Sequence, residues 1–143
     1  MAHKFKVATA AGTFDHFHRG HETFLSAAFK LADTIHIGIA SDLFAKSKRQ
    51  IDKISPYTDR KGDVEAFLKT KGLLGRAHIM ELHDIYGPTL ERDCPIAAII
   101  ITHKTRYGAE LINKLRKQKG LSVLPIEEVS YVSAQDNGDL SSS

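Results

Sequence analysis

A short segment near the start of the chain carries the residue types that polyphosphate chemistry needs. It runs from Gly12 to His21 and contains two histidines three residues apart, His18 and His21. It follows an apolar run and leads into a predicted helix, whose first turn offers unpaired N–H groups and a positive dipole end. Gly12 allows a tight turn, and Gly20 lets a ligand approach the backbone closely. The segment therefore predicts an anion site that suits a polyphosphate.

The charge state of the two imidazoles decides what they can do. Residues three apart lie on the same face of a helix, so both rings can face one point at the helix entrance. The helix dipole disfavours an imidazolium there, so we expect neutral rings that donate N–H at pH 7. Such donors can hold phosphate oxygens while charge builds up in a transition state.

These histidines also have plainer explanations. Most isolated histidines lie on surfaces or satisfy hydrogen bonds in a core, and His36 and His78 fit that description. A metal site built from His16, His18 and His21 is an alternative for the segment. No carboxylate or cysteine stands at a ligand-like spacing to complete it, so we favour the phosphate site.

The rest of the chain alternates between strand-like and helix-like patterns. Apolar residues at positions 25, 28, 29 and 32 follow the helical period, and residues 97–102 form an uninterrupted apolar run typical of a strand buried on both faces. Residues 45–56 are polar and aperiodic, which predicts a surface loop, and Tyr86-Gly87-Pro88 predicts a turn. The predicted strands are 5–10, 34–40, 77–82, 97–102 and 122–126; the predicted helices begin at about residue 20, span 58–71 with Gly72 as the stop, and span 104–119 with Gly120 as the stop.

This alternation predicts an α/β fold. Strands that alternate with helices build a parallel sheet with right-handed crossovers, here of about five strands with helices on both faces. No repeat or internal linker interrupts the pattern, so we expect a single domain over residues 1–143. Ligands in such sheets bind outside the carboxyl ends of the strands, which is where the segment from Gly12 to His21 falls.

Composition excludes several classes of protein. The 143 residues are 42% hydrophobic and 26% charged, as in ordinary globular proteins, and a single cysteine, Cys94, rules out a disulfide framework. No apolar run is long enough to span a membrane and no signal-like segment is present, so we expect a cytoplasmic protein without a membrane partner. The net charge is +3, and the sequence lacks the basic stripes with interleaved aromatic residues that are typical of nucleic-acid binders. We therefore expect no nucleic-acid partner.

At this point the residues carry a resemblance. Gly12-Thr13-Phe14-Asp15 followed by His18-Arg19-Gly20-His21 resembles the signature of the HxGH nucleotidyltransferase superfamily. Within it the chain resembles the archaeal-type phosphopantetheine adenylyltransferases, related to a domain of eukaryotic coenzyme A synthase. The resemblance covers nearly the whole chain and implies a Rossmann-like sheet. The later segments that support it are Ser41-Asp42 with Lys46 and Lys48, Tyr86-Gly87-Pro88-Thr89, Thr105 with Gly108-Ala109-Glu110, Ile112-Asn113 with Arg116, and Leu140-Ser141-Ser142-Ser143.

The resemblance implies a reaction and roles for individual residues. The reaction is adenylyl transfer from ATP to 4′-phosphopantetheine, giving dephospho-coenzyme A and pyrophosphate in coenzyme A biosynthesis. By motif matching, His18 and His21 bind ATP phosphates, His21 being the better candidate for the α-phosphate, and Thr13 helps to hold the acceptor phosphate. Lys46 or Lys48 neutralises the reacting phosphates. His18, His21 and Lys46 are therefore the expected catalytic residues.

The remaining expectations concern binding. Mg²⁺ is expected to arrive with ATP, held mainly by phosphate oxygens and water. Arg106 and Arg116 are candidates for gripping the triphosphate, although Arg116 could instead cap its helix. The family's last segment continues into an arginine and a helix, whereas this chain ends at Ser143, so we expect C-terminal truncation. The further substrate-binding candidates are Gly12, Phe14, Asp15, Gly20, Thr105, Ser141, Ser142 and Ser143.

Other functions remain open from the sequence. Cytidylyltransferases and archaeal FAD synthetases share the HxGH signature, so CTP as donor or FMN as acceptor are alternatives. A non-catalytic nucleotide sensor could keep the fold, although both motif histidines and Thr13 argue against it. A basic RNA-binding module is the weakest alternative. A homo-oligomer is compatible with the sequence.

Overall fold

The computed structural model describes residues 3–49 and 54–129, with the side chains of Lys48 and Arg49 left undescribed. No helix in these ranges is both long enough and apolar enough to cross a membrane. The elements are β1 (Phe5–Gly12), α1 (Arg19–Leu31), β2 (Ala32–Ala40), α2 (Asp42–Arg49), α3 (Tyr57–Thr70), η1 (Leu74–Arg76), β3 (Ala77–Leu82), η2 (Gly87–Leu90), β4 (Ala98–Ile101), η3 (His103–Thr105), α4 (Arg106–Gln118) and β5 (Ile126–Glu128), where η marks a short 3₁₀ helix.

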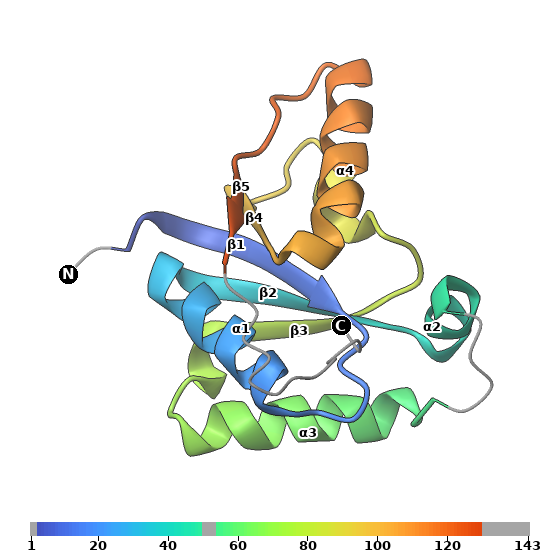
Figure 1. The fold of residues 1–143 in the computed structure, drawn as a ribbon. Coiled ribbons are helices and arrows are strands. Elements are labelled where there is room, and N and C mark those ends of the chain that lie inside the picture. Colours follow the sequence, from blue (N-terminus) through green and yellow to red (C-terminus); the bar gives the residue numbers. More distant parts are fainter. Residues whose placement is uncertain (1–2, 50–53, 130–143) are drawn as a thin grey trace.

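A parallel sheet forms the centre of the molecule (Figure 1). Its five strands lie in the order β3-β2-β1-β4-β5, and every neighbouring pair is parallel. The chain leaves β1 towards β2 and β3 on one side, and only later returns to β4 and β5 on the other. The switch in strand order therefore falls between β1 and β4, where ligands of open α/β sheets bind.

Helices α1 and α3 cover one face of the sheet (Figure 1). The period-2 alternation of β2 points Ile35, Ile37 and Ile39 to this face, and all three are fully buried. They pack in one core cluster with Leu25 of α1 and Leu68 of α3. This larger part of the core fixes the start of α1 against the end of β1.

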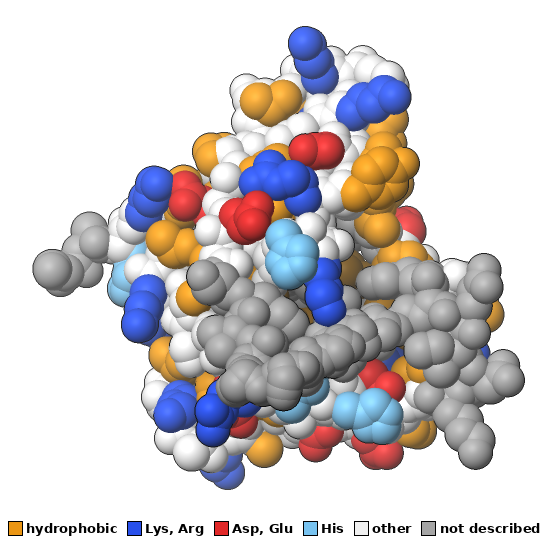
Figure 2. Space-filling model, in the orientation of Figure 1, with side chains coloured by type: hydrophobic (Ala, Val, Ile, Leu, Met, Phe, Trp, Pro, Cys, Tyr) orange, Lys and Arg blue, Asp and Glu red, His pale blue; other side chains and the backbone are white. Residues whose placement is uncertain are grey.

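Helix α4 covers the opposite face over β4 and β5, where it forms an upper protrusion (Figure 1). Ile99 and Ile101 of β4 pack there against Ala109 and Ile112 of α4. Figure 2 shows acidic and basic side chains interleaved over this protrusion on the face in view. The two helix layers together give the α/β arrangement with helices on both faces that the sequence predicts.

The period of the apolar residues and the positions of the glycines located most elements correctly. The strand predicted over 77–82 has the bounds of β3, and the helix predicted over 58–71 is α3 shifted by one residue. Both predicted stops are confirmed, since Gly72 and Gly120 have positive φ angles of 71° and 79° just beyond their helices. The first helix ends one residue early, at Leu31, because Ala32 already begins β2.

The prediction of a loop over 45–56 was wrong in its first part, because α2 extends to Arg49. The hydroxyl of Ser41 accepts a hydrogen bond from the N–H of Phe44 at 3.1 Å and so caps the helix. Asp42 lies in the first turn, where a negative charge favours the helix dipole, and Ala45 is buried. Local capping therefore outweighs the polar composition.

Two further boundaries differ from the predictions. The last strand is residues 126–128 rather than 122–126, because Pro125 has no N–H for a ladder and contributes only its carbonyl, to Ile99. Leu124, just before it, still packs into the core and is held by two hydrogen bonds with the side chain of Asn113. The turn predicted at 86–88 is the 3₁₀ helix η2.

Candidate active site

The loop between β1 and α1 has an unusual backbone. Gly12, expected to make a tight turn, is instead the last residue of β1. The left-handed conformation falls on Phe14 and His16, with φ angles of 56° and 49°. Such angles cost of order 1 kcal/mol or more in residues with a side chain, and they cluster where function requires them. The ring of Phe14 is buried, so packing holds this part of the loop in place.

The structure brings His18 and His21 together at the start of α1. Their rings stack with centroids 4.0 Å apart. Nδ1 of His18 accepts a hydrogen bond from the N–H of Gly20 at 3.0 Å, and Nδ1 of His21 accepts one from the N–H of His18 at 3.2 Å. A ring nitrogen that accepts carries no proton, so the proton of each neutral ring lies on Nε2. The two rings therefore each hold an Nε2–H donor at the helix entrance.

The surroundings of His18 favour its neutral form, and those of His21 hold its ring in place. Burial lowers the pKa of His18, and the positive charge of Lys104 lowers it further. His21 is buried between two aromatic rings, Phe14 at 5.4 Å and Phe17 at 5.3 Å between centroids. Burial and the charge of Lys104 both favour the neutral form of His18, and burial is the larger cause.

Two other loop residues differ in what they contact. Thr13 is fully buried, and its hydroxyl has no hydrogen-bond partner within the described parts of the chain. The carboxylate of Asp15 accepts a hydrogen bond from the N–H of Ser55 at 3.2 Å and lies 3.3 Å from Nε2 of His16. Thr13 therefore offers an unused hydroxyl, whereas Asp15 ties the loop to the segment before α3.

The metal alternative finds no support in these contacts. His16 is exposed and pairs with Asp15 at 3.3 Å. Within residues 3–49 and 54–129, no group of three His, Cys, Asp or Glu side chains is arranged to hold a metal ion. Nδ1 of each stacked ring already accepts a backbone N–H.

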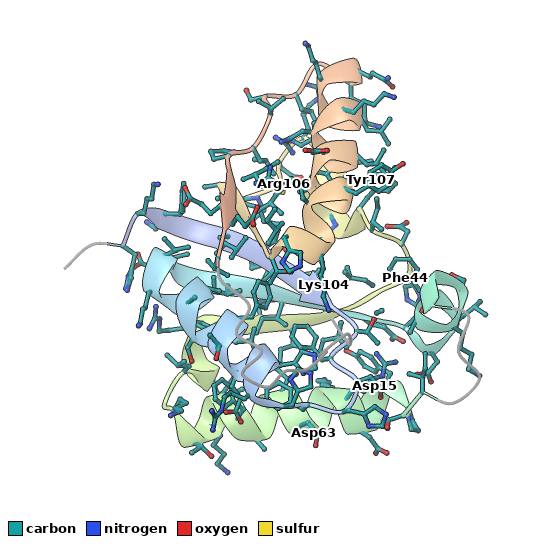
Figure 3. The ribbon with its side chains drawn as sticks, viewed as in Figure 1. Asp15, Phe44, Asp63, Lys104, Arg106 and Tyr107 are labelled. Atoms are coloured by element: carbon teal, nitrogen blue, oxygen red, sulfur yellow. The ribbon has the colours of Figure 1, made fainter. Side chains whose placement is uncertain are left out.

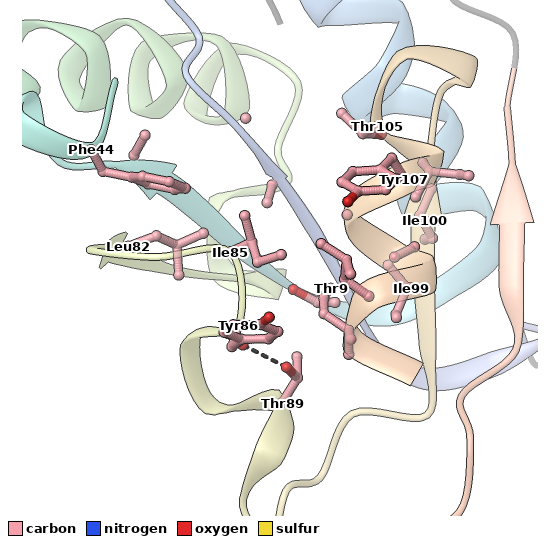
Figure 4. Close-up of a pocket in the computed structure, with 18 of the residues that line it drawn as sticks. Thr9, Phe44, Leu82, Ile85, Tyr86, Thr89, Ile99, Ile100, Thr105 and Tyr107 are labelled. Atoms are coloured by element: carbon pink, nitrogen blue, oxygen red, sulfur yellow. Dashed lines mark hydrogen bonds between the residues drawn. The ribbon is translucent and has the colours of Figure 1, made fainter. Parts of the chain in front are cut away.

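A cavity of about 270 Å³ opens beside this loop, on the face of the sheet that α4 partly covers. Its walls come from the carboxyl halves of β1, β3 and β4 and from α2, η2 and α4 (Figure 4). Most of the lining is apolar, including Leu82, Ile85 and Ile99, with Phe44 and Tyr107 on opposite sides. The cavity suits a chain without charge. Sequence reasoning missed it because these residues lie far apart along the chain.

The junction of β4 and α4 contributes a cation that the sequence analysis did not single out. Lys104 lies by the carboxyl end of β1 and lines the cavity together with Thr105 (Figure 3). Its charge lowers the pKa of His18, although burial is the larger cause, so the lysine is close to the histidine pair. A signal existed: Lys104 lies three residues beyond the carboxyl end of the buried strand β4, the usual place for ligand contacts.

The two predicted arginines have other partners. Arg106 is exposed and makes ion pairs with Glu128 at 2.8 Å and Glu110 at 3.9 Å. Arg116 is buried and donates hydrogen bonds to the carbonyls of Ser122 and Thr89. Its partners fit a structural role better than a grip on the triphosphate.

The remaining predicted residues divide between described and undescribed parts. Lys46 is exposed on α2 and does not line the cavity, whereas Phe44 of the same helix does. Gly20 is buried in the first turn of α1. The side chain of Lys48 and all of Ser141, Ser142 and Ser143 lie outside the described residues.

Comparisons with known proteins agree with this architecture. The protein is 35% identical over 142 residues to a phosphopantetheine adenylyltransferase of Methanothermobacter thermautotrophicus, covering 99% of this chain and 84% of that one. It is 35% identical over 140 residues to a phosphopantetheine adenylyltransferase of Methanopyrus kandleri, covering 98% and 88%. A solved structure of a protein of unknown function from Archaeoglobus fulgidus superposes with a TM-score of 0.78 at 28% identity, covering 90% of this chain and 92% of that one.

The chain also matches a family profile, and the match includes the segment from Gly12 to His21. Residues 9–143 match the profile of cytidylyltransferase-like proteins, and that range contains the loop after β1, the histidine pair and the cavity walls. The match covers far more than half of the chain. The chain therefore belongs to the cytidylyltransferase-like family of nucleotidyltransferases.

Proposed function

We propose that this nucleotidyltransferase transfers the adenylyl group of ATP to 4′-phosphopantetheine, giving dephospho-coenzyme A and pyrophosphate. The observation that carries the proposal is the pairing of two Nε2–H donors at a helix start with an apolar cavity beside them. The donors suit the phosphates of a nucleotide, and the cavity suits the uncharged arm of the acceptor. The curated relatives carry the name of this activity.

The chemistry asks for positioning and charge stabilisation. A phosphate oxygen of 4′-phosphopantetheine attacks the α-phosphorus of ATP in line, the new P–O bond forms, and the bond to pyrophosphate breaks on the opposite side. A phosphate monoester is largely ionised near neutral pH, so no general base is needed. The protein's contribution is then to hold two phosphates in line and to stabilise the charge that develops between them.

The described residues divide this work between them. His18 and His21 donate from Nε2 to oxygens of the ATP phosphates, with His21 as the better candidate for the α-phosphate. The hydroxyl of Thr13, buried and unused, donates to the acceptor phosphate. Lys104 supplies positive charge beside His18, the role that the resemblance implies for Lys46 or Lys48. The N-terminus of α1 adds its dipole to the same point.

The acceptor arm enters the cavity between α2, η2 and α4. Its methyl groups and methylenes match walls such as Leu82 and Ile85, and its phosphate end lies towards Gly12 at the end of β1, next to Thr13. Mg²⁺ enters with ATP as part of the substrate and balances the charge of the triphosphate. Phosphate oxygens and water would hold the ion.

One assay tests the proposal directly. The protein is incubated with ATP and Mg²⁺, with and without 4′-phosphopantetheine, and both pyrophosphate and dephospho-coenzyme A are measured. We expect pyrophosphate only when the acceptor is present, in a one-to-one ratio with dephospho-coenzyme A. Replacing ATP by CTP, or the acceptor by FMN, serves as the control for the other activities that share the signature. Equal turnover with either replacement would overturn the proposal.

A further inference from the structure

Arg60 of α3 is a buried arginine whose contacts converge on the candidate site. Its side chain is only 1% exposed, yet it lies in the first turn of a helix whose other polar residues face solvent. Its guanidinium donates to three backbone carbonyls: Thr13 at 2.9 Å, Ala40 at 2.8 Å and Ser55 at 2.8 Å. It also pairs with the carboxylate of Asp42 at 2.7 Å.

The partners of Arg60 belong to separate segments. Thr13 lies in the loop that leads to His18, and Ala40 is the last residue of β2. Asp42 begins α2, the helix that carries the cavity wall Phe44. One side chain therefore joins the loop that presents phosphate-binding groups to the helix that borders the cavity.

A guanidinium is suited to this task. It has five N–H donors in a fixed planar fork, so its contacts define both distance and direction. A lysine could keep the charge, but its single ammonium cannot reach the same set of carbonyls in the same plane. The loop it holds contains the two strained residues Phe14 and His16, which persist only where their surroundings constrain them.

Helix α2 depends on this tether more than the longer helices do. It has only eight residues, and Ala45 is its fully buried anchor among residues with described side chains. The cap by Ser41 fixes where the helix begins, but a cap does not fix its distance from the loop after β1. The bridge from Thr13 through Arg60 to Asp42 spans that distance.

We infer that Arg60 is a positioning residue that sets the spacing between the phosphate-binding loop and α2, and hence the alignment of the two substrates. The inference rests on the proposed function, because both substrates must meet at this spacing. Displacement of reacting groups by about 1 Å can lower a rate a hundred-fold. The effect should therefore appear in kcat more strongly than in the KM for either substrate.

The test compares Arg60→Lys with Arg76→Lys. Arg76 also donates to three carbonyls, those of Phe29, Ala32 and Asp33, but at the opposite end of the sheet. Both variants are assayed well below their melting temperatures, where each is fully folded. We expect Arg60→Lys to lower kcat about ten- to a hundred-fold with less than about three-fold change in either KM. Arg76→Lys should keep the kcat of the unchanged protein even where its melting temperature falls as far.

Asp42→Asn provides a second variant if Arg60→Lys does not fold. Asp42 is half exposed, so the loss of its charge leaves the core intact while it loosens the tether to α2. We expect a kcat loss of about three- to ten-fold for Asp42→Asn alone. If Arg60→Lys folds, the double variant should lose no more than Arg60→Lys does, because both changes act through one contact. Unchanged kcat in Asp42→Asn, or additive losses in the double variant, would overturn the inference.

Amide hydrogen exchange separates this inference from the proposed function. In Arg60→Lys without substrates, exchange should rise in residues 13–18 and 42–47 together and stay unchanged in residues 29–33. Faster exchange there in a protein that forms no dephospho-coenzyme A would support the tether and reject the proposed function. Unchanged exchange and unchanged kcat in an active protein would reject the tether alone.

Discussion

At each end of the sheet an arginine donates to backbone carbonyls, but the two arginines join different parts of the chain. At the amino end, Arg76 donates to carbonyls of residues 29, 32 and 33, all within one junction between α1 and β2. At the carboxyl end, Arg60 donates to carbonyls of residues 13, 40 and 55, which belong to three distant segments. The first arginine closes a regular helix end, whereas the second assembles irregular chain around the candidate site.

This difference shows that the amino end of the sheet has mainly a structural role, whereas the carboxyl end must also hold the loop of the candidate site in position. The amino end joins regular elements, so a local cap satisfies its backbone. The carboxyl end must hold a loop with two left-handed residues at a set distance from α2 and the cavity. Irregular backbone can bring phosphate-binding groups together, but it needs side chains such as Arg60 to satisfy its carbonyls.

Replacement of the two arginines by methionine should give the largest difference in stability. Arg60→Met leaves three carbonyls and the charge of Asp42 without their donor, so we expect a loss of about 3–5 kcal/mol in the free energy of unfolding. Arg76→Met removes contacts that are partly open to water, and we expect about 1–2 kcal/mol. Urea denaturation measures both. Equal losses would mean that the two ends are tethered equally.

Variants of His21 test whether the reaction takes place at the carboxyl end of the sheet. Asn can replace Nδ1 as acceptor for the N–H of His18 but cannot place a donor where Nε2–H lies. We expect His21→Asn to lower kcat about a hundred- to a thousand-fold when it is assayed at a temperature where the variant is fully folded. His21→Gln, whose amide reaches towards the Nε2 position, should lose less.

The control is His78→Asn. His78 stacks on His36 across β2 and β3, with centroids 4.8 Å apart, and lies outside the cavity. Its loss should leave kcat unchanged. A kcat for His21→Asn close to that of His78→Asn would return the motif histidine to a capping role.

Narrowing the cavity should affect one substrate and not the other. Ala11 of β1 lines the cavity and is exposed to it, so Ala11→Leu can occupy space there without overpacking the core. We expect the KM for 4′-phosphopantetheine to rise about ten-fold while the KM for ATP stays the same. Ala11→Ser controls for the change of residue without added volume. A larger rise in the KM for ATP would place the nucleotide in the cavity.

The smallest expected effect concerns Lys104 and the titration of His18. Burial and then Lys104 lower the pKa of His18 below its ordinary value of about 6.5, so the neutral donor persists as the pH falls through that value. A lowered pKa also means that stability from this group is lost as the pH falls below about 6.5 towards the folded-state value. Lys104→Met should raise the pKa of His18, as followed by its ring-proton NMR signal. An unchanged pKa would show that lysine and histidine do not interact.

Most of the fold could be predicted from the sequence because local patterns of apolar residues and glycines determine where these strands and helices lie. The strand at 77–82, the helix at 58–71 and the glycine stops follow from period and punctuation. Helix α2 was missed because its polar run resembles a loop, and the deciding contact is a single cap by Ser41. Its one strong local signal is Ser41-Asp42, residue types that favour a helix N-cap and an acidic first turn.

The candidate site was only half predictable. The loop and the histidine pair are contiguous in sequence, so spacing alone places them. Arg60 looked like an ordinary charged residue near a helix start. Its spacing to Val64, Phe67 and Leu68 follows i, i+4, i+7 and i+8, which puts it on the buried face and could have identified it. The cavity depends on strand order, which no local pattern contains.

The central claim is that ATP phosphates meet the histidine pair while the acceptor arm occupies the cavity. NMR on labelled protein tests it in one titration series. MgATP should shift the ring-proton signals of His18 and His21, and 4′-phosphopantetheine alone should shift the methyl signals of Leu82 and Ile85. The ring of His78 should not respond to either. Histidine signals that stay unmoved by MgATP, or cavity methyl signals that respond only to ATP, would contradict the account.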